Sequence, residues 1–391
     1  MMSANSVVPI SSASLFSLQE LCDGVVDKLS DVFVEADSLI DLRSIALVSP
    51  NFRDAAQRVI FSDVSIQRQG TGYKDEEATW MRFLATMRTS PHLLRYVKSL
   101  TAPVEDRIIG GLSVLELPNL QRLAFDHLNH PDKDISYLAI ARMIAFPTIR
   151  SVSFIHLDVT LALFLGLFKS FTPRITRLGI HGVHDEAQSS ANVAFNLESV
   201  QISALRIANM PLRPGSDWIL DPLCPFEFGS VRELVLGANM VAAGDSEYAA
   251  MLAAILDRVR NNLEELIVQD QQYMTSLVSL ANLHSLRALC ININNRHLLE
   301  LLLPLLPSHS LRDLSLIIHC DEQSIEFSPI LKLSSVMTTN ALPVLRNINL
   351  VFIGIDSLDA ETTKGIQGAL ISWMNAGKLS INCVVSERRP R

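Results

Sequence analysis

The feature that most constrains the fold of this chain is a short apolar phrase that recurs along most of its length. In each copy an apolar residue is followed three and five positions later by two more. Successive copies begin 22 to 34 residues apart. The copies are Val97/Leu100/Ala102, Leu120/Leu123/Phe125, Ile149/Val152/Phe154, Ile175/Leu178/Ile180, Leu197/Val200/Ile202, Val231/Leu234/Leu236, Leu263/Leu266/Val268, Leu286/Leu289/Ile291, Leu311/Leu314/Leu316 and Leu345/Ile348/Leu350. Such a period predicts similar units stacked one after another rather than a single closed core.

Each phrase fits one short strand, because side chains two positions apart on a strand point to the same face. Between the phrases lie helical stretches: "DISYLAIARMIAF", "VTLALFLGLFKSF", "SEYAAMLAAILDRV" and "RHLLELLLPLL". One strand and one helix cannot bury their apolar faces alone, so neighbouring units are expected to share a core. The spacing is that of leucine-rich repeats. We therefore predict an α/β fold in which residues 97–385 form an irregular solenoid of about ten units, with parallel strands on one side and helices on the other.

A doubly wound α/β domain is the structural alternative, since it also alternates strands and helices. Strands buried on both faces are usually continuous Val/Ile runs, whereas here the strands are marked by a repeating phrase. A strand order that reverses about a central crevice would identify the alternative.

The first 66 residues follow a different, helical pattern. Residues 1–16 are rich in Ser and Ala and are expected to form a disordered tail. Ser17 and Glu20 have the spacing of a capping box, and apolar residues then recur at helical intervals. Further helices are expected to start at Ser38 and at Ser49, and "FSDVSI" alternates as a strand does. We predict a three-helix unit over residues 17–66, a linker and connecting helix over 67–96, and a disordered tail over 386–391.

Composition favours a protein partner. The formal net charge is −8, and the only Lys/Arg cluster is the terminal "ERRPR", which argues against nucleic acid or an anionic membrane as partner. Five cysteines lack C-x-x-C spacing, as expected of reduced thiols in the cytoplasm or nucleus. No signal-peptide pattern is present, and the apolar runs are shorter than the ~18 residues of a membrane span.

No motif supports catalysis or a cofactor. The chain has no complete G-x-G-x-x-G, P-loop or G-x-S-x-G sequence. His127/His130 and His181/His184 have H-x-x-H spacing, but each pair follows a strand phrase and is expected to lie in a loop rather than bind metal. We therefore expect no catalytic residues, no metal and no cofactor. An enzyme would require separated polar residues that converge in a pocket.

The stretch "SLQELCDGVVDKLSDVFVEADSLIDLRSIALVSPNFRDAAQRVIFSDVSI" resembles the F-box, particularly the version common in fungal proteins. The first-helix pattern E-L-x-x-x-I-x-x-x-L is matched by Glu20, Leu21, Val25 and Leu29. The middle pattern L-x-x-x-x-L-V-S-x-x-[FW]-r-x-x-a is matched by Leu42, Leu47, Val48, Ser49, Phe52, Arg53 and Ala56. The chain has Ser17 and Leu18 where the family usually has Leu-Pro. "MRTSPHLLRYVKSLT" is similar to the family's junction with leucine-rich repeats.

The resemblance implies a substrate receptor of a Skp, cullin and F-box ubiquitin ligase, acting in ubiquitin-dependent degradation. The F-box would bind the Skp adaptor and through it a cullin, and the repeats would select an unknown target protein. The expected adaptor-binding residues are Leu18, Leu21, Val25, Val26, Leu29, Leu42, Leu47, Val48 and Phe52. Any of them could instead form the core of the unit. The alternative function is a leucine-rich-repeat interaction scaffold with a vestigial F-box and no ubiquitin role.

Target binding is expected in the repeat domain. Positions just after the inward residues of each strand point outward, and they include Asp126, His181, Gln269 and Asn292. These side chains differ in size and hydrogen-bonding capacity, which suits recognition of a specific surface. Loops carry binding as often, so the outward face of the sheet and the loops remain two candidate locations.

Overall fold

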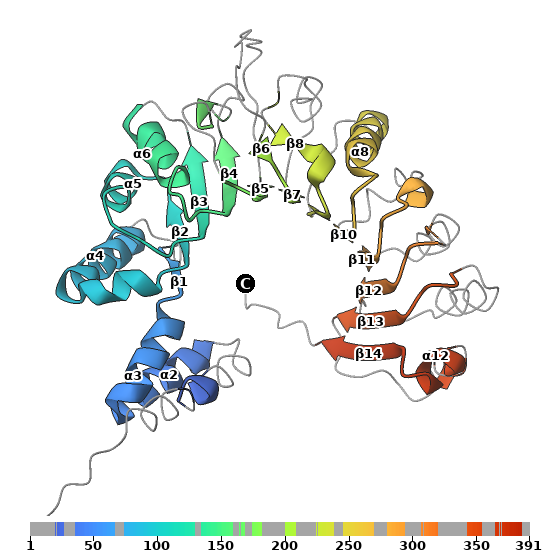
Figure 1. The fold of residues 1–391 in the computed structure, drawn as a ribbon, viewed down its shortest axis with the longest axis horizontal. Helices are drawn as coiled ribbons and strands as arrows, with labels where there is room; N and C mark the ends of the chain where they lie inside the picture. The colour runs from blue at the N-terminus through green and yellow to red at the C-terminus, as the bar shows by residue number, and fades with distance from the viewer. Residues whose placement is uncertain are drawn as a thin grey trace, which may run out of the picture. The chain divides into compact units, whose positions relative to one another are not determined.

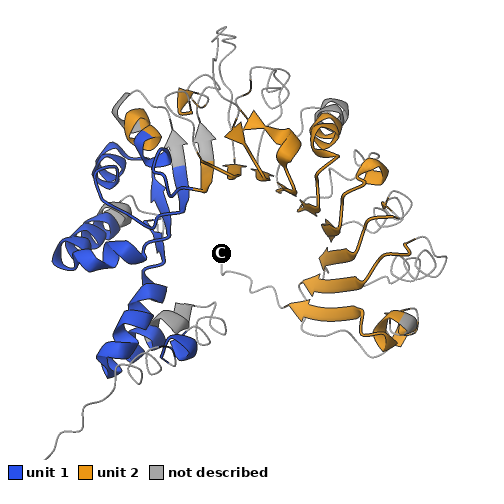
Figure 2. Cartoon of the chain, viewed as in Figure 1, with its two compact units in different colours: residues 1–126, 142–149 blue, residues 127–141, 150–391 orange. Residues whose placement is uncertain are grey.

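The structure is a computed structural model of the 391-residue chain. It describes residues 20, 22–26, 36–66, 74–129, 134–158, 164, 166–168, 174–181, 200–208, 224, 226–237, 245–269, 280–293, 306–307, 309–319, 342–353, 364–366, 368 and 370–384. Two compact units divide the chain: unit 1 is residues 1–126 with 142–149, and unit 2 is residues 127–141 with 150–391 (Figure 2).

Unit 1 begins with helices and continues into strands (Figure 1). Glu20 and residues 22–26 are helical. The elements that follow are α2 (Ala36–Val48), α3 (Pro50–Ile60), β1 (Asp63–Ser65), α4 (Lys74–Thr89), the 3₁₀ helix η1 (Pro91–Tyr96), β2 (Ser99–Pro103), α5 (Asp106–Leu112) and β3 (Arg122–Asn129), whose last residues belong to unit 2. The predicted start at Ser49 is confirmed, because its Oγ accepts a hydrogen bond from the Phe52 N–H at 3.4 Å. The predicted start at Ser38 is wrong, since α2 begins at Ala36.

Unit 2 alternates strands with helices. Helix α6 (Asp134–Ile144) contributes residues to both units. The remaining elements are β4 (Ser151–Asp158), β5 (Arg177–His181), β6 (Val200–Gln201), β7 (Ala204–Ala208), β8 (Phe226–Glu227), η3 (Phe228–Ser230), β9 (Glu233–Leu236), α8 (Asp245–Val259), β10 (Glu265–Val268), β11 (Ala288–Ile293), β12 (Asp313–His319), β13 (Asn347–Ile353), α12 (Ile371–Asn375) and β14 (Leu379–Val384).

The strands form a parallel sheet whose order follows the chain. The 12-stranded sheet runs β1-β2-β3 through unit 1 and β4-β5-β7-β9-β10-β11-β12-β13-β14 through unit 2. The described pairings are parallel, and β6 and β8 form a separate parallel pair. In unit 1, α4 and α5 lie on one side of the strands, and in unit 2, α8 and α12 lie on one side of the strands (Figure 1). The predicted leucine-rich-repeat-like solenoid is confirmed, and the doubly wound alternative is wrong, because the strand order does not reverse.

Strand register explains the repeating phrase. Leu234, Leu266 and Leu289 pair with one another across β9, β10 and β11, and Leu314 and Ile348 continue this line into β12 and β13. A second line, two residues further along each strand, consists of Leu236, Val268, Ile291, Leu316 and Leu350. All ten side chains are 2% exposed or less. The phrase therefore supplies the continuous core of the array.

At nine places in the described part of the array, a single backbone carbonyl at the start of one strand anchors the neighbouring strand. The carbonyl of Arg232 accepts hydrogen bonds from the N–H groups of Glu264 and Glu265, both at 2.8 Å. The carbonyl of Arg287 likewise accepts from Arg312 at 2.8 Å and Asp313 at 2.9 Å. The same paired acceptance occurs at Ser62, Lys98, Arg150, Thr176, Ser203, Glu264 and Arg312. These bonds satisfy the backbone donors that precede each strand and fix the register of its neighbour.

One phrase predicted from the sequence lies in the wrong frame. Val200 belongs to β6, outside the 12-stranded sheet, whereas β7 carries the overlapping phrase Ile202/Leu205/Ile207. Leu205 pairs with Leu178 on one side and Leu234 on the other. The two frames share the same apolar spacing, so periodicity alone could not separate them. In the observed frame, copies begin at residues 175, 202 and 231, which gives more even intervals.

The array also has a strand at each end that the ten phrases did not include. At the start, "FSDVSI" forms β1, and Val64 pairs with Leu100. At the end, Leu379 of β14 pairs with Ile348. The predicted helical unit of residues 17–66 therefore ends in the first strand of the sheet.

Aromatic side chains fill the core near β4. Phe154 lies 5.3 Å from Phe164 between ring centroids, and Phe168 lies 4.9 Å from Phe226, both with edge-to-face geometry. Phe226 is in turn 6.3 Å from Phe228 of η3. Edge-to-face pairs are favourable beyond their buried area. This cluster packs the small β6 and β8 pair against the rest of unit 2.

Candidate interaction surfaces

The helical unit has a small core of its own. Val26, Leu42 and Ala55 are buried together. The partly buried side chains that pack against them are Ile45, Phe52, Val59 and Ile60. Three residues predicted to bind the adaptor, Val26, Leu42 and Phe52, thus lie in or against this core. Their contribution to any partner surface would be to hold its shape.

Three other predicted adaptor residues are exposed. Leu47 is 81% exposed and Val48 is 72% exposed at the end of α2, and Val25 is 40% exposed. Arg53, which matches the F-box pattern, donates from Nε to the carbonyl of Ala46 at 3.5 Å and links α3 to the end of α2. Apolar side chains exposed on so small a unit are typical of a protein interface. Leu18, Leu21 and Leu29 lie outside the described residues, as does the Ser17 of the predicted capping box.

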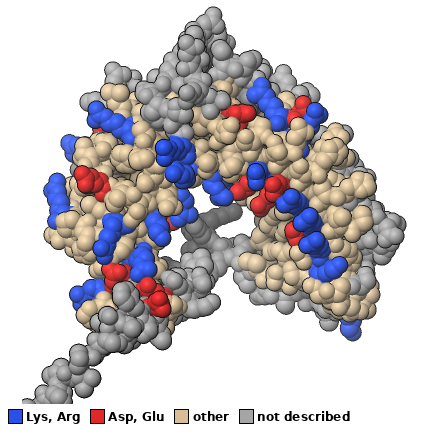
Figure 3. Space-filling model, in the orientation of Figure 1, with Lys and Arg blue, Asp and Glu red and all other residues tan. Residues whose placement is uncertain are grey.

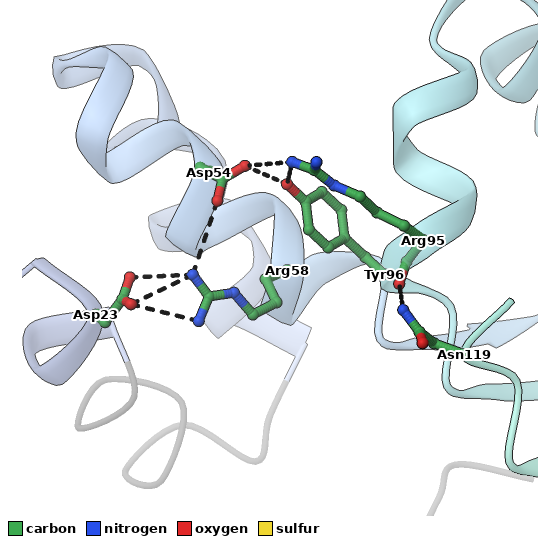
Figure 4. A network of polar contacts seen from close by, with 6 residues as sticks. All are labelled: Asp23, Asp54, Arg58, Arg95, Tyr96 and Asn119. Carbon is green, nitrogen blue, oxygen red and sulfur yellow. Dashed lines mark hydrogen bonds and ion pairs between the residues drawn. The ribbon is translucent and has the colours of Figure 1, made fainter. Parts of the chain in front are cut away.

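A polar network connects the helical unit to the start of the repeats (Figure 4). Asp54 of α3 accepts hydrogen bonds from the Tyr96 hydroxyl and, at 3.1 Å, from Nη2 of Arg95. The Arg95 guanidinium also lies 4.7 Å from the centre of the Tyr96 ring and donates to the Tyr96 hydroxyl. The carbonyl of Arg95 accepts from Asn119 at 2.6 Å. Helix α3 is thereby tied to η1 and to the loop before β3.

The network extends back to the first helical segment. Arg58 of α3 donates to both carboxylate oxygens of Asp23, at 3.2 Å to Oδ1 and 3.3 Å to Oδ2. The same guanidinium lies 3.7 Å from Asp54. Burial raises the pKa of Tyr96, and its hydrogen bond to Asp54 raises it further, while Arg95 acts in the opposite direction. The network therefore favours the neutral phenol of Tyr96.

The predicted target-binding residues are half-buried positions of the sheet. Asp126 lies on β3 in unit 1, while His181, Gln269 and Asn292 lie at β5, β10 and β11 in unit 2. The structure joins two of them, because the Asn292 side-chain amide donates to the carbonyl of Gln269 at 3.3 Å. Their role in target binding stays a prediction.

A groove in unit 2, at the starts of β9 to β12, was not found by the sequence analysis. It has a volume of about 350 Å³, is open to solvent, and is lined by Arg232, Glu264, His284, Arg287, His309 and Arg312 among others. Glu264 lies 3.8 Å from Nη1 of Arg232 and 3.4 Å from Nη1 of Arg287. A row of basic side chains, with acidic ones beside it, is visible over this part of unit 2 in Figure 3.

A sequence signal for this groove exists in the repeating phrase. The position directly after the first apolar residue is Arg232, Arg287, Arg312 and Arg346 in four of the last five copies, and Glu264 in the fifth. This column of charged residues is not apparent when only the apolar positions of the phrase are compared. The column coincides with the carbonyls that anchor successive strands.

Cys290 occupies an outward position on β11. Burial raises its pKa, the nearby Glu265 carboxylate raises it further, and a hydrogen bond with Ser315 lowers it. The thiol is therefore held in its neutral form at physiological pH.

Within the described ranges, no group of three His, Cys, Asp or Glu side chains has an arrangement suited to a metal ion. His130, His184 and the side chain of His127, which belong to the two H-x-x-H pairs, lie outside these ranges. No described helix is both long enough and apolar enough to span a membrane.

Comparison with models of protein families finds no family that matches this chain, and comparison with curated proteins finds no match.

Proposed function

We propose that this protein is the substrate-recognition subunit of a Skp, cullin and F-box type ubiquitin ligase, and has no catalytic activity of its own. The helical unit binds the Skp adaptor, and the array of repeats binds the protein to be ubiquitylated. The proposal is supported by the F-box-like pattern of residues 17–66 followed by a solenoid, the arrangement that the resemblance implies.

The observation that carries the proposal is the exposed pair Leu47 and Val48. The two belong to the pattern L-V-S, and in the structure the Ser of that pattern caps α3 while the Leu and Val face solvent. Burying such a side chain contributes about 1.5 to 3 kcal/mol, so leaving both exposed sacrifices stability unless a partner covers them. Val25 offers a third exposed apolar side chain for the same partner.

The test is adaptor binding by the double variant Leu47→Asp with Val48→Asp. Loss of two buried side chains should weaken binding of a purified Skp adaptor by about 3 kcal/mol or more, roughly a hundredfold, as measured by calorimetry. The matched control, Met81→Asp with Leu138→Asp, places the same charges at exposed apolar helix positions outside the helical unit and should bind normally. Equal binding by both double variants would refute the adaptor assignment.

The scaffold with a vestigial F-box is the second candidate, and the network at Asp54 is the observation that favours it. Because Asp54 contacts Arg95 and Tyr96, the helical unit could serve only as an N-terminal cap on the repeats. In that case no Skp adaptor binds the full-length protein, and Asp54→Ala destabilises the strands that follow.

A further inference from the structure

We propose that the groove at the starts of β9 to β12 binds an extended acidic segment of a protein, through carboxylates that pair with Arg287 and Arg312. This inference deepens the proposed function. It rests on that function in one respect, namely that the acidic segment belongs to the target protein.

The backbone places like charges side by side at this groove. Arg287 and Arg312 line it, and Arg346 occupies the same position before the next strand. The backbone N–H of each arginine donates to the carbonyl of Glu264, Arg287 or Arg312, respectively, at the start of the neighbouring strand. Neighbouring strands lie about 4.8 Å apart, and like charges at adjacent positions repel. An anionic ligand would remove that repulsion.

The acidic side chains nearby do not neutralise this charge. Glu264 is shared between Arg232 and Arg287, and within the described part of the chain no residue forms an ion pair with Arg312. Glu233 and Asp313 directly follow Arg232 and Arg312 in the chain, but both have other partners. Glu233 pairs with Arg177 at 3.2 Å, and Asp313 accepts a hydrogen bond from the Asn347 amide at 2.6 Å. Neither of these acids lines the groove.

The walls of the groove are held in place before any ligand binds. Ser285 donates to the carbonyl of Asn261 at 2.6 Å, and Asn262 donates to the carbonyl of Gly229 at 2.7 Å. These bonds link neighbouring turns of the array. The exposed rings of His284 and His309 add hydrogen-bonding groups beside the arginines. A preorganised wall reduces the entropy lost on binding.

The arrangement suits carboxylates along a chain better than one phosphate. A phosphate group is bound best by donors that converge on one point, whereas these arginines stand in a row over successive strands. Glu264 would also repel a dianion at one end of the row. Nucleic acid fits poorly, because the described residues that line the groove include no Phe, Tyr or Trp for base stacking and the chain as a whole carries a net charge of −8.

The test uses the full-length protein and a fluorescein-labelled peptide of alternating Glu and Gly, followed by fluorescence anisotropy. We expect saturable binding that weakens as salt is raised, and no binding of the matching Gln and Gly peptide. Arg287→Glu with Arg312→Glu should weaken binding by about tenfold or more, because two attractions become repulsions. The control Arg88→Glu with Arg142→Glu makes the same change of net charge at exposed helix positions and should bind as the wild type.

A gain of affinity provides a second, independent sign. Glu264→Gln removes the one acidic group among the described residues that line the groove and should tighten peptide binding by about threefold. The groove proposal is wrong if both double variants bind alike, if Glu264→Gln weakens binding, or if only a phosphoserine peptide or a short RNA binds. Adaptor binding by the same variants is measured separately. A negative result in the peptide test therefore does not change the result of the adaptor test, and a negative result in the adaptor test does not change the result of the peptide test.

Discussion

The helical unit and the array of strands bury their apolar residues in different ways. In the helical unit a few side chains around Val26, Leu42 and Ala55 form a local core, and apolar residues such as Leu47 stay exposed. In the array inward residues such as Leu266 pair with counterparts on both neighbouring strands, so the core is continuous. A core this small needs support from polar contacts: Arg58 joins α3 to Asp23 within the unit, and Asp54 joins α3 to Arg95 and Tyr96 outside it.

The largest expected difference between the two regions concerns their cores. Leu266→Ala should lower the free energy of unfolding of the array by about 3 kcal/mol or more, because the cavity lies between two neighbouring strands. Leu42→Ala should destabilise the helical unit and leave the strands protected. Hydrogen exchange with mass spectrometry measures both. If Leu42→Ala increases exchange in β10 as much as Leu266→Ala does, the two regions do not unfold separately.

A smaller effect is expected from close packing within the sheet of unit 2. A Cβ at Gly237 would lie 2.2 Å from the Cβ of Ala208 on the neighbouring strand. Gly237→Ala should therefore destabilise the array by about 1 to 3 kcal/mol in urea unfolding. The double variant with Ala208→Gly should regain most of this loss, since it removes the atom that clashes. Additive effects of the two substitutions would show that the clash is not the cause.

The boundary of the helical unit is expected to be pH-dependent. Tyr96→Phe should cost about 1 kcal/mol at neutral pH by removing the hydrogen bond to Asp54. Because the folded protein raises the pKa of Tyr96 above its ordinary value of 10.0, its contribution is present below pH 10 and is lost as the pH rises through the folded pKa. Stability of the wild type should therefore fall more steeply in alkali than that of Tyr96→Phe. Parallel curves would contradict this.

The smallest effect is a change in thiol reactivity on β11. Glu265→Gln removes a neighbouring negative charge and should lower the pKa of Cys290, speeding its alkylation at neutral pH by about twofold. Glu116→Gln, an exposed acid in unit 1, is the matched control. Peptide mapping after brief iodoacetamide treatment resolves Cys290 from the other cysteines. An unchanged pH profile would show that Glu265 does not influence the thiol.

The sequence predicted those parts of the fold in which the residue pattern is compatible with a single local structure. The inward residues Leu266 and Val268 and the cap at Ser49 belong to this class. The frame at Leu197 failed because Val200 and Leu205 both satisfy the apolar spacing, and only pairing across the sheet distinguishes them. The strand β14 was missed because Leu379 and Ile381 are half-buried at the end of the array and have no complete phrase before them.

The candidate surfaces were less predictable than the fold. Apolar residues that match a motif can lie either in the core of a small unit or on its surface. The sequence therefore did not distinguish the buried Val26 and Leu42 from the exposed Leu47 and Val48. The groove depends on charged residues 23 to 32 positions apart that become neighbours only when strands stack. Outward positions such as Asn292 were foreseen, but the edge that carries the arginines lies before the strands and not on them.

The paired hydrogen bonds that anchor nine of the described strands have a consequence for how such a chain can vary. At these anchors one carbonyl sets the register of the neighbouring strand, so the length of sequence between anchors is free to change: Leu289 and Leu314 are 25 positions apart, and Leu314 and Ile348 are 34 apart. An insertion between anchors would lengthen one outer segment without shifting any other strand. A proline at either donor position would remove one of the two bonds at that anchor. The array can therefore gain or lose surface segments during evolution, or by engineering, one repeat at a time.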